Sequence, residues 1–121
     1  MQRAAQAYQR VANEIGSARD LEANLLLRSA ARFQAIRDGW DCRKFEIGDA
    51  LLQNRTLWMI LLASVTNDDN PLPAEIRQNV ANLGIFVINR TIKLTINPQP
   101  DALDVLININ RELATGLKSH A

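Results

Sequence analysis

The sequence predicts an all-α protein, a small single-domain bundle of about five helices. Apolar residues recur three and four positions apart in successive segments, which is the spacing of one helix face. Three segments rich in Gly, Pro, Asn and Asp interrupt this pattern: "RDGWDCRK" at 37–44, "TNDDNPLP" at 66–73 and "NPQPD" at 97–101. A chain of 121 residues, 47% of them hydrophobic, is long enough for one buried core. We therefore take residues 1–121 as one helical domain.

The first part of the chain predicts two helices that separate near residue 17. Residues 1–16 carry a single narrow apolar stripe, which predicts a short N-terminal helix that can detach from the bundle. Ser17 followed by Asp20 resembles a capping box, with Asp where Glu is preferred, and marks the predicted start of the second helix. That helix is expected to end near Gly39.

Three further helices are expected in the rest of the chain. The third runs from about Phe45 to Val65. The fourth starts at Pro73, whose missing N–H costs nothing at the first helical position, and the fifth starts at Asp101. In the last two, residues in helical register mark the buried face: Ile76, Val80, Leu83, Val87, Leu103, Leu106, Ile107, Asn110, Leu113 and Leu117.

An α+β fold with a C-terminal β-hairpin is the alternative. "RTIKLTIN" at 90–97 and "DVLININ" at 104–110 alternate apolar and polar residues and are rich in β-branched side chains. The unbroken length from Pro73 to about Ile96 favours a helix instead, as do Asp101 and Asp104 at a helix start.

The sequence lacks the residues that common active sites require, so we expect no enzymatic activity, no catalytic residues, no cofactor, no metal site and no small-molecule substrate. The one histidine, His120, lies beside the C-terminus, where chain ends fray. Without a positioned histidine, Ser-His and Cys-His nucleophiles cannot be assembled. The one cysteine, Cys42, cannot form an internal disulfide, which fits a reducing compartment. The longest apolar run, at 57–63, is far short of the ~20 residues that cross a bilayer. With no secretory signal visible either, we expect a cytoplasmic protein.

The charge balance argues against direct nucleic-acid binding. The formal net charge is +1, from 14 Lys and Arg against 13 Asp and Glu. Non-specific binding to nucleic acid requires a strongly basic face. The nearest candidates are interpreted as an ordinary solvated surface: Arg28, Arg32, Arg37, Arg43 and Lys44.

The stretch "ALLQNRTLWMILLAS" at 50–64 places an amide and a permanent cation in an otherwise apolar helix. On a helix, Arg55 lies one turn from Trp58, and its guanidinium can stack on the indole or reach a carboxylate on another helix. Asn54 can bond the backbone of a crossing segment. One interpretation is therefore a structural clamp between helices. The other is that Arg55 and Trp58 rim a groove that receives a partner.

Other polar and aromatic residues have both structural and binding interpretations. Trp40, in a polar loop, either caps the end of the core or is an exposed interface anchor. Tyr8 is a further candidate for partner binding. The remaining candidates are expected to cap or join helices: Asn70, Pro73, Asn108 and Asn110.

Six short motifs follow one another along nearly the whole chain: "AY" at 7–8, "RDLE" at 19–22, "ALLQNRTLW" at 50–58, "NPLP" at 70–73, "LGIFV" at 83–87 and "LININRELATGL" at 106–117. In this order they resemble the flagellar biosynthesis regulator FlaF family. One departure is Phe86-Val87, where that family usually has a pair such as Trp-Val.

The resemblance implies a small helical cytoplasmic protein that is needed for flagellin production and filament assembly. It implies action as a chaperone of flagellin, or on flagellin synthesis together with a companion regulator that acts on flagellin mRNA. The first hypothesis is a flagellin-binding module, the alternative a post-transcriptional regulator that contacts RNA directly or through the companion protein. The family brings no catalytic residues, and it favours the helix over the hairpin.

Overall fold

Every regular element in residues 2–119, the part of the chain that the computed structural model describes, is helical. Side chains are described for residues 3–7, 9–10 and 18–119. The elements in chain order are α1 (Gln2–Asp38), α2 (Trp40–Arg43), the 3-10 turn η1 (Lys44–Glu46), α3 (Ile47–Thr66), α4 (Ala74–Ile96) and α5 (Leu103–Ser119). The predicted all-α fold is confirmed.

The alternative fold with a C-terminal β-hairpin is wrong. Residues 90–96 complete α4, and residues 104–110 belong to α5. The hydroxyls of Thr91 and Thr95 donate to backbone carbonyls about one turn earlier in α4, both at 2.8 Å. Such bonds let a β-branched threonine fit a helix. Burial along α4 recurs at spacings of three and four residues, so the apparent alternation is a coincidence of helical periodicity.

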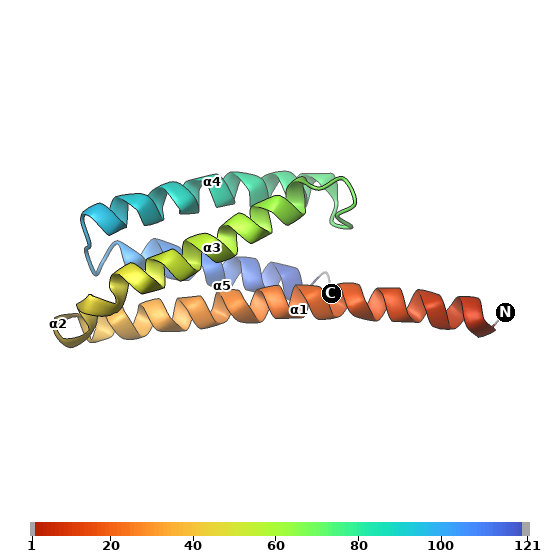
Figure 1. Ribbon diagram of the computed structural model, residues 1–121, viewed down its shortest axis with the longest axis horizontal. Helices are drawn as coiled ribbons and strands as arrows, with labels where there is room; N and C mark the ends of the chain where they lie inside the picture. Colours follow the sequence, from red (N-terminus) through yellow and green to blue (C-terminus); the bar gives the residue numbers. More distant parts are fainter. Residues whose placement is uncertain (1, 120–121) are drawn as a thin grey trace.

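The predicted break near Ser17 is also wrong, because α1 is one helix of 37 residues that runs through Gly16 and Ser17. A glycine in a helix interior costs only about 1 kcal/mol relative to alanine, which good helix formers on both sides offset. Figure 1 shows the N-terminal part of α1 extending past the rest of the molecule, and the described side chains at 3–7 and 9–10 are exposed. That this part detaches stays a prediction.

Two predicted helix-capping residues occupy different positions from those expected. Pro73 is the N-cap of α4 rather than its first helical residue, with φ −54°. Its carbonyl accepts the first bond of the helix, from the Arg77 N–H at 3.0 Å. Asn108 is neither a cap nor a joint, because it lies exposed in the middle of α5.

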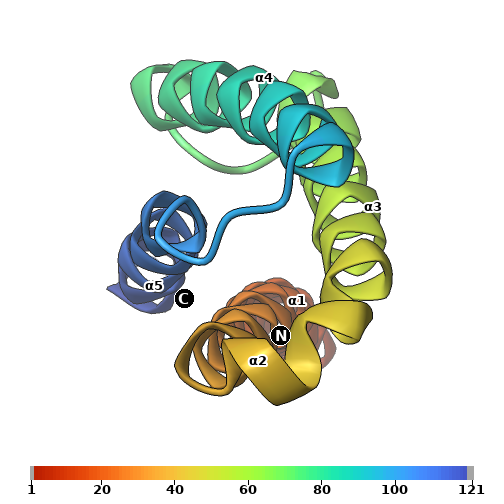
Figure 2. The same cartoon turned by 90° about the vertical axis from the view of Figure 1, so that its left-hand side faces the viewer.

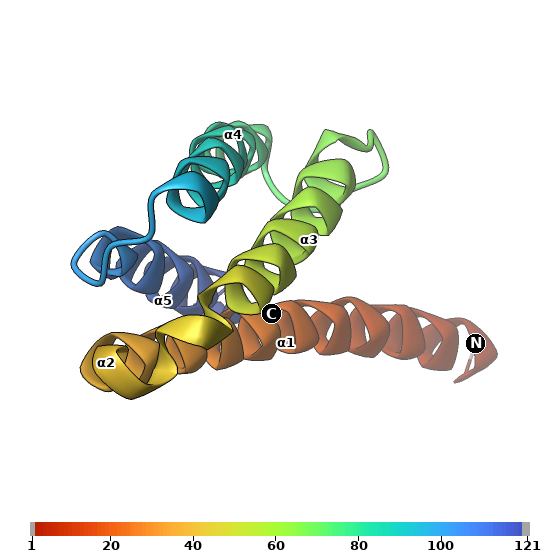
Figure 3. The ribbon, with the colours of Figure 1, turned by 60° about the vertical axis from the view of Figure 1, so that its left-hand side comes forward.

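The four long helices surround a common core, as the end-on view in Figure 2 shows. α1 packs along α5 and α3 packs along α4, while α3 also contacts α1. The chain passes around the core in the order α1, α3, α4, α5, and α2 with η1 makes the turn between α1 and α3 (Figures 2 and 3). α1 and α3 diverge along their length, which Figure 3 shows from the side.

Apolar side chains from all four long helices fill the core. Burying each large one stabilises the fold by about 1.5–3 kcal/mol. The largest fully buried apolar side chains are Trp58, Phe33, Leu26, Ile36, Leu51, Leu61, Leu103, Leu106, Ile107 and Val87. This burial accounts for the inner face of each helix but not for the apolar outer face of α3.

Candidate functional site

Helix α3 carries large apolar side chains on its outer side, beside polar ones, as well as toward the core. A group of exposed large apolar side chains often marks a surface that a partner covers. Here Leu52, Met59 and Ile60 are 50%, 55% and 61% exposed on the outer side of α3. On the neighbouring helix α1, Leu21 and Leu25 are also exposed, at 60% and 38%. The outer surface between α1 and α3 therefore has the character of a surface that another chain covers.

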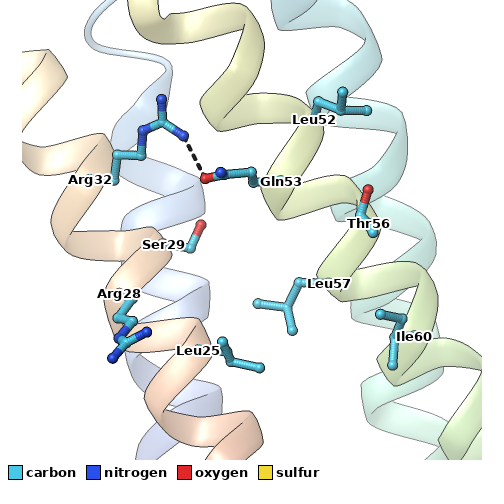
Figure 4. A pocket seen from close by; sticks show the side chains of 9 residues that line it. All are labelled: Leu25, Arg28, Ser29, Arg32, Leu52, Gln53, Thr56, Leu57 and Ile60. Carbon is cyan, nitrogen blue, oxygen red and sulfur yellow. Dashed lines mark hydrogen bonds between the residues drawn. The ribbon is translucent and has the colours of Figure 1, made fainter.

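An open groove of about 620 Å³ lies between α1 and α3. Figure 4 shows its two walls: α1 contributes Leu25 and α3 contributes Leu52, Leu57 and Ile60. Leu57 is partly buried and packs against the core, so it lies deeper than the exposed side chains at the edges. The remaining lining residues are polar: Arg28, Ser29, Arg32, Gln53 and Thr56. A volume and apolar lining of this kind suit one face of an amphipathic helix.

Hydrogen bonds between α1 and α3 close one end of this α1–α3 groove. Arg32 donates from Nη1 to Asp49 Oδ2 at 3.0 Å and to Gln53 Oε1 at 2.5 Å, the second of which is drawn in Figure 4. Arg28, one turn earlier on α1, is exposed and has no hydrogen bond, ion pair or ring contact with any residue of the described part. The groove therefore contains one neutralised and one unpaired cation.

A chain of buried polar side chains lies beneath the groove and joins three helices. Ser29 Oγ of α1 donates to Asn54 Oδ1 of α3 at 2.9 Å. Asn110 of α5 donates from Nδ2 to the same Asn54 oxygen at 2.8 Å, and its own Oδ1 accepts the Trp58 indole N–H at 2.9 Å. Asn54, Trp58 and Asn110 are all 0% exposed. Buried polar groups that pair only in one arrangement fix the relative position of the helices that carry them.

A clamp between helices is present, but it is not the one predicted, because Arg55 takes no part in it. Asn54 bonds side chains on other helices rather than backbone, and Asn110 joins α5 to α3. Trp58 belongs to the core, so the interpretation that it rims a partner groove is wrong. Arg55 is half-buried and makes no ion pair, hydrogen bond or ring contact within the described part of the chain. The predicted stacking of Arg55 on Trp58 is absent, and the one cation–ring contact described joins Arg90 to Phe86 at 5.2 Å.

The two other aromatic candidates have different outcomes. Trp40 is half-buried and packs against the core at the end of the bundle, which is the position that the core-cap alternative predicts. Tyr8 lies on the helical backbone of α1, but its side chain is outside the described residues. Its role in partner binding stays a prediction.

Two side chains hold the connection between α3 and α4. One of them, Asn70, was predicted to cap or join helices. Asn70 donates from Nδ2 to the Ser64 carbonyl at 3.1 Å and accepts the Leu72 N–H at 3.0 Å. Arg77 of α4 donates to the Val65 and Asn67 carbonyls at 2.8 and 2.9 Å. These bonds satisfy carbonyls that the end of α3 leaves without helical partners. Asn70 thus joins the two helices, and the role of Arg77 was not predicted.

Glu22 on α1 allows a pH-dependent test of how burial affects the stability of the fold. Burial raises the pKa of its carboxyl, and the nearby Arg19 guanidinium opposes the shift. A folded-state pKa above the unfolded one means that the charged form destabilises the fold and that protonation removes this cost. We expect Glu22→Gln to stabilise the protein at pH 7, by less than about 1 kcal/mol because the group is partly solvated. The advantage should disappear at about pH 3, well below the ordinary pKa of glutamate, where the carboxyl is protonated in both states.

Thermal denaturation at both pH values measures this effect. Glu112→Gln, at an exposed position of α5, is the matched control and should change the melting temperature at neither pH. A loss of stability in Glu22→Gln at pH 7 would show that the charged carboxylate is stabilising and would contradict the argument.

None of the helices described in residues 2–119 is both long and apolar enough to cross a membrane. The described side chains also contain no group of three or more His, Cys, Asp or Glu residues placed to hold a metal ion.

The comparisons with known proteins assign the family. No curated protein and no solved structure matches the chain. The family model described as flagellar protein FlaF matches residues 4–117, which covers nearly the whole chain and includes both walls of the groove. The chain therefore belongs to the FlaF family of flagellar proteins.

Proposed function

We propose that this protein is a non-enzymatic, cytoplasmic flagellin-binding protein that acts as a secretion chaperone and as a regulator of flagellin synthesis and filament assembly. The observation that carries the proposal is the α1–α3 groove, together with the uncovered apolar side of α3. Membership of a flagellar family supports the choice of flagellin as the partner.

A groove between two helices suits the part of flagellin that needs protection. The ends of unassembled flagellin subunits are apolar, and they become helical in the filament. An amphipathic helix binds such a groove through side chains at positions i, i+3 or i+4 and i+7. The exposed apolar side chains of α1 and α3 supply complementary contacts: Leu21, Leu25, Leu52 and Ile60. Covering them in a complex would remove from water the apolar surface that the isolated protein leaves exposed.

Direct contact with flagellin mRNA receives less support. Of the arginines that would form a basic face, Arg32 bonds Asp49 at 3.0 Å and Arg43 bonds Glu46 at 2.6 Å. Carboxylates beside these cations reduce the positive potential available to phosphates. A second apolar cavity of about 580 Å³, between α3 and α4, instead favours a second protein partner such as the companion regulator. Its lining includes Met59 and Ile85, which are 55% and 56% exposed.

Titration of the purified protein with purified monomeric flagellin tests the proposal. We expect a saturable complex whose dissociation constant changes little between about 0.1 M and about 0.5 M salt, because apolar contacts are not screened. Flagellin leader RNA titrated in parallel should not bind. Absence of a flagellin complex at both salt concentrations would contradict the proposal, and RNA binding that weakens steeply with salt would favour the alternative.

A further inference from the structure

The chemistry of the α1–α3 groove specifies more about its occupant than an apolar face. Nine residues line it, and two of them carry a formal charge, Arg28 and Arg32. Arg32 is already held by Asp49 and Gln53. The hydroxyl of Ser29 is used by Asn54. Arg28 is thus the one charged lining residue that has no partner in the described part of the chain.

The two ends of the groove differ. The bonds from Arg32 to α3 close the end that Leu52 and Gln53 mark in Figure 4. The opposite end, marked by Leu25 and Ile60, opens toward the N-terminal part of α1. Leu21, one turn beyond Leu25, continues the exposed apolar wall in that direction. An elongated occupant can therefore lie along α1 and pass beyond the groove without meeting another helix.

A helix is the occupant that these walls fit. The described residues form no strand and so offer no sheet edge for an extended peptide. Two helices with an open groove between them accept a third helix through the packing that already joins the helices of this bundle. Phosphate groups of a nucleic acid would find one unpaired arginine among leucine and isoleucine side chains, so a polypeptide is favoured over RNA.

We propose that the α1–α3 groove selects an amphipathic helix carrying a carboxylate side chain that pairs with Arg28, and that Arg28 determines its specificity. The identification of this helix with a segment of flagellin rests on the proposed function; the preference for an acidic amphipathic helix does not. A guanidinium beside apolar walls is partly desolvated when the groove fills, so an uncharged or basic residue opposite it is penalised.

Two designed peptides test the preference independently of flagellin. Both are amphipathic helices with leucines at i, i+3 and i+7, and they differ only in carrying glutamate or lysine beside the apolar face. We expect the full-length protein to bind the glutamate peptide about tenfold more tightly than the lysine peptide, and Arg28→Glu to reverse this order. Arg111→Glu, at an exposed position of α5 outside the groove, is the matched control for net charge. It should leave the preference unchanged.

The outcomes separate this inference from the proposed function. Equal binding of the two peptides, binding of neither, or an equal response to Arg28→Glu and Arg111→Glu would overturn the inference. A glutamate preference that depends on Arg28, without a complex with flagellin, would support the inference and contradict the proposed function. If flagellin binds and Arg28→Glu leaves that binding unchanged, the proposed function is supported and the inference about Arg28 is contradicted. Self-association in sedimentation experiments that Arg28→Glu abolishes would assign the groove to a second copy of this chain and overturn the proposal.

Discussion

Replacement of Asn110 by alanine is expected to destabilise the protein by about 3 kcal/mol. The substitution removes two buried hydrogen bonds, to Trp58 at 2.9 Å and to Asn54 at 2.8 Å. It leaves the indole N–H of Trp58, which is fully buried, without an acceptor. A buried donor without a partner loses its hydration and gains nothing in exchange. The lost side-chain volume adds the cost of a small cavity.

Urea denaturation followed by circular dichroism measures this loss. Asn108→Ala is a closely matched control, because it makes the same chemical change two residues away on the exposed side of α5. It should change the free energy of unfolding by no more than about 0.5 kcal/mol. Equal effects of the two substitutions would show that the buried network does not hold the helices together.

The double variant Leu52→Lys and Ile60→Lys is expected to lose flagellin binding by about 100-fold or more, with little change in stability. Both side chains are at least half-exposed in the free protein, so the fold does not depend on burying them. In the complex they would be covered, and each lysine would then have to be desolvated against an apolar helix. Lysine also forms helices well, which limits the effect on α3 itself.

Calorimetric titration with flagellin, together with melting temperatures, checks this prediction. The control is Ile92→Lys with Ile96→Lys, two exposed isoleucines of α4 that lie outside the α1–α3 groove. If the control loses binding equally, the effect is one of charge and not of the groove. If the double variant binds normally, flagellin uses another surface, such as the cavity between α3 and α4.

The apolar periodicity predicted the helices but not that α1 continues without a break through Ser17. The apolar spacing placed α3, α4 and α5 correctly, because it follows from which face each helix buries. The break near Ser17 was predicted from a local capping pattern that the structure does not use. A capping pattern is a weak signal inside a segment of good helix formers, since the intact helix satisfies the same backbone groups.

The roles of the polar residues depended on tertiary packing and could be predicted only in part. Asn108 and Asn110 are two positions apart on one helix, so one must face outward when the other faces the core. Asn110 shares the register of the buried residues of α5, and that periodicity correctly predicted it on the buried face. The burial of Trp58 was harder to predict, because the acceptor for its indole N–H is Asn110, 52 positions later in the sequence and on another helix.

The sequence of α3 contains a signal of the groove. α3 has more apolar residues than one buried face requires, as the exposed Leu52, Met59 and Ile60 show. Such an excess indicates a second covered surface. Which neighbouring helix forms the other wall follows from how α1 and α3 diverge, and no local pattern encodes that angle.

The close packing of α1 against α5 has a consequence for biosynthesis. These helices are joined by an ion pair between Arg37 and Asp104, 67 positions apart, and α1 packs along the length of α5. A ribosome synthesises α1 first, so the side of that helix that packs along α5 has no native neighbour until α5 has left the exit tunnel, whereas α3 can pack against α1 earlier. Completion of the fold therefore waits for the last of the described helices rather than advancing helix by helix.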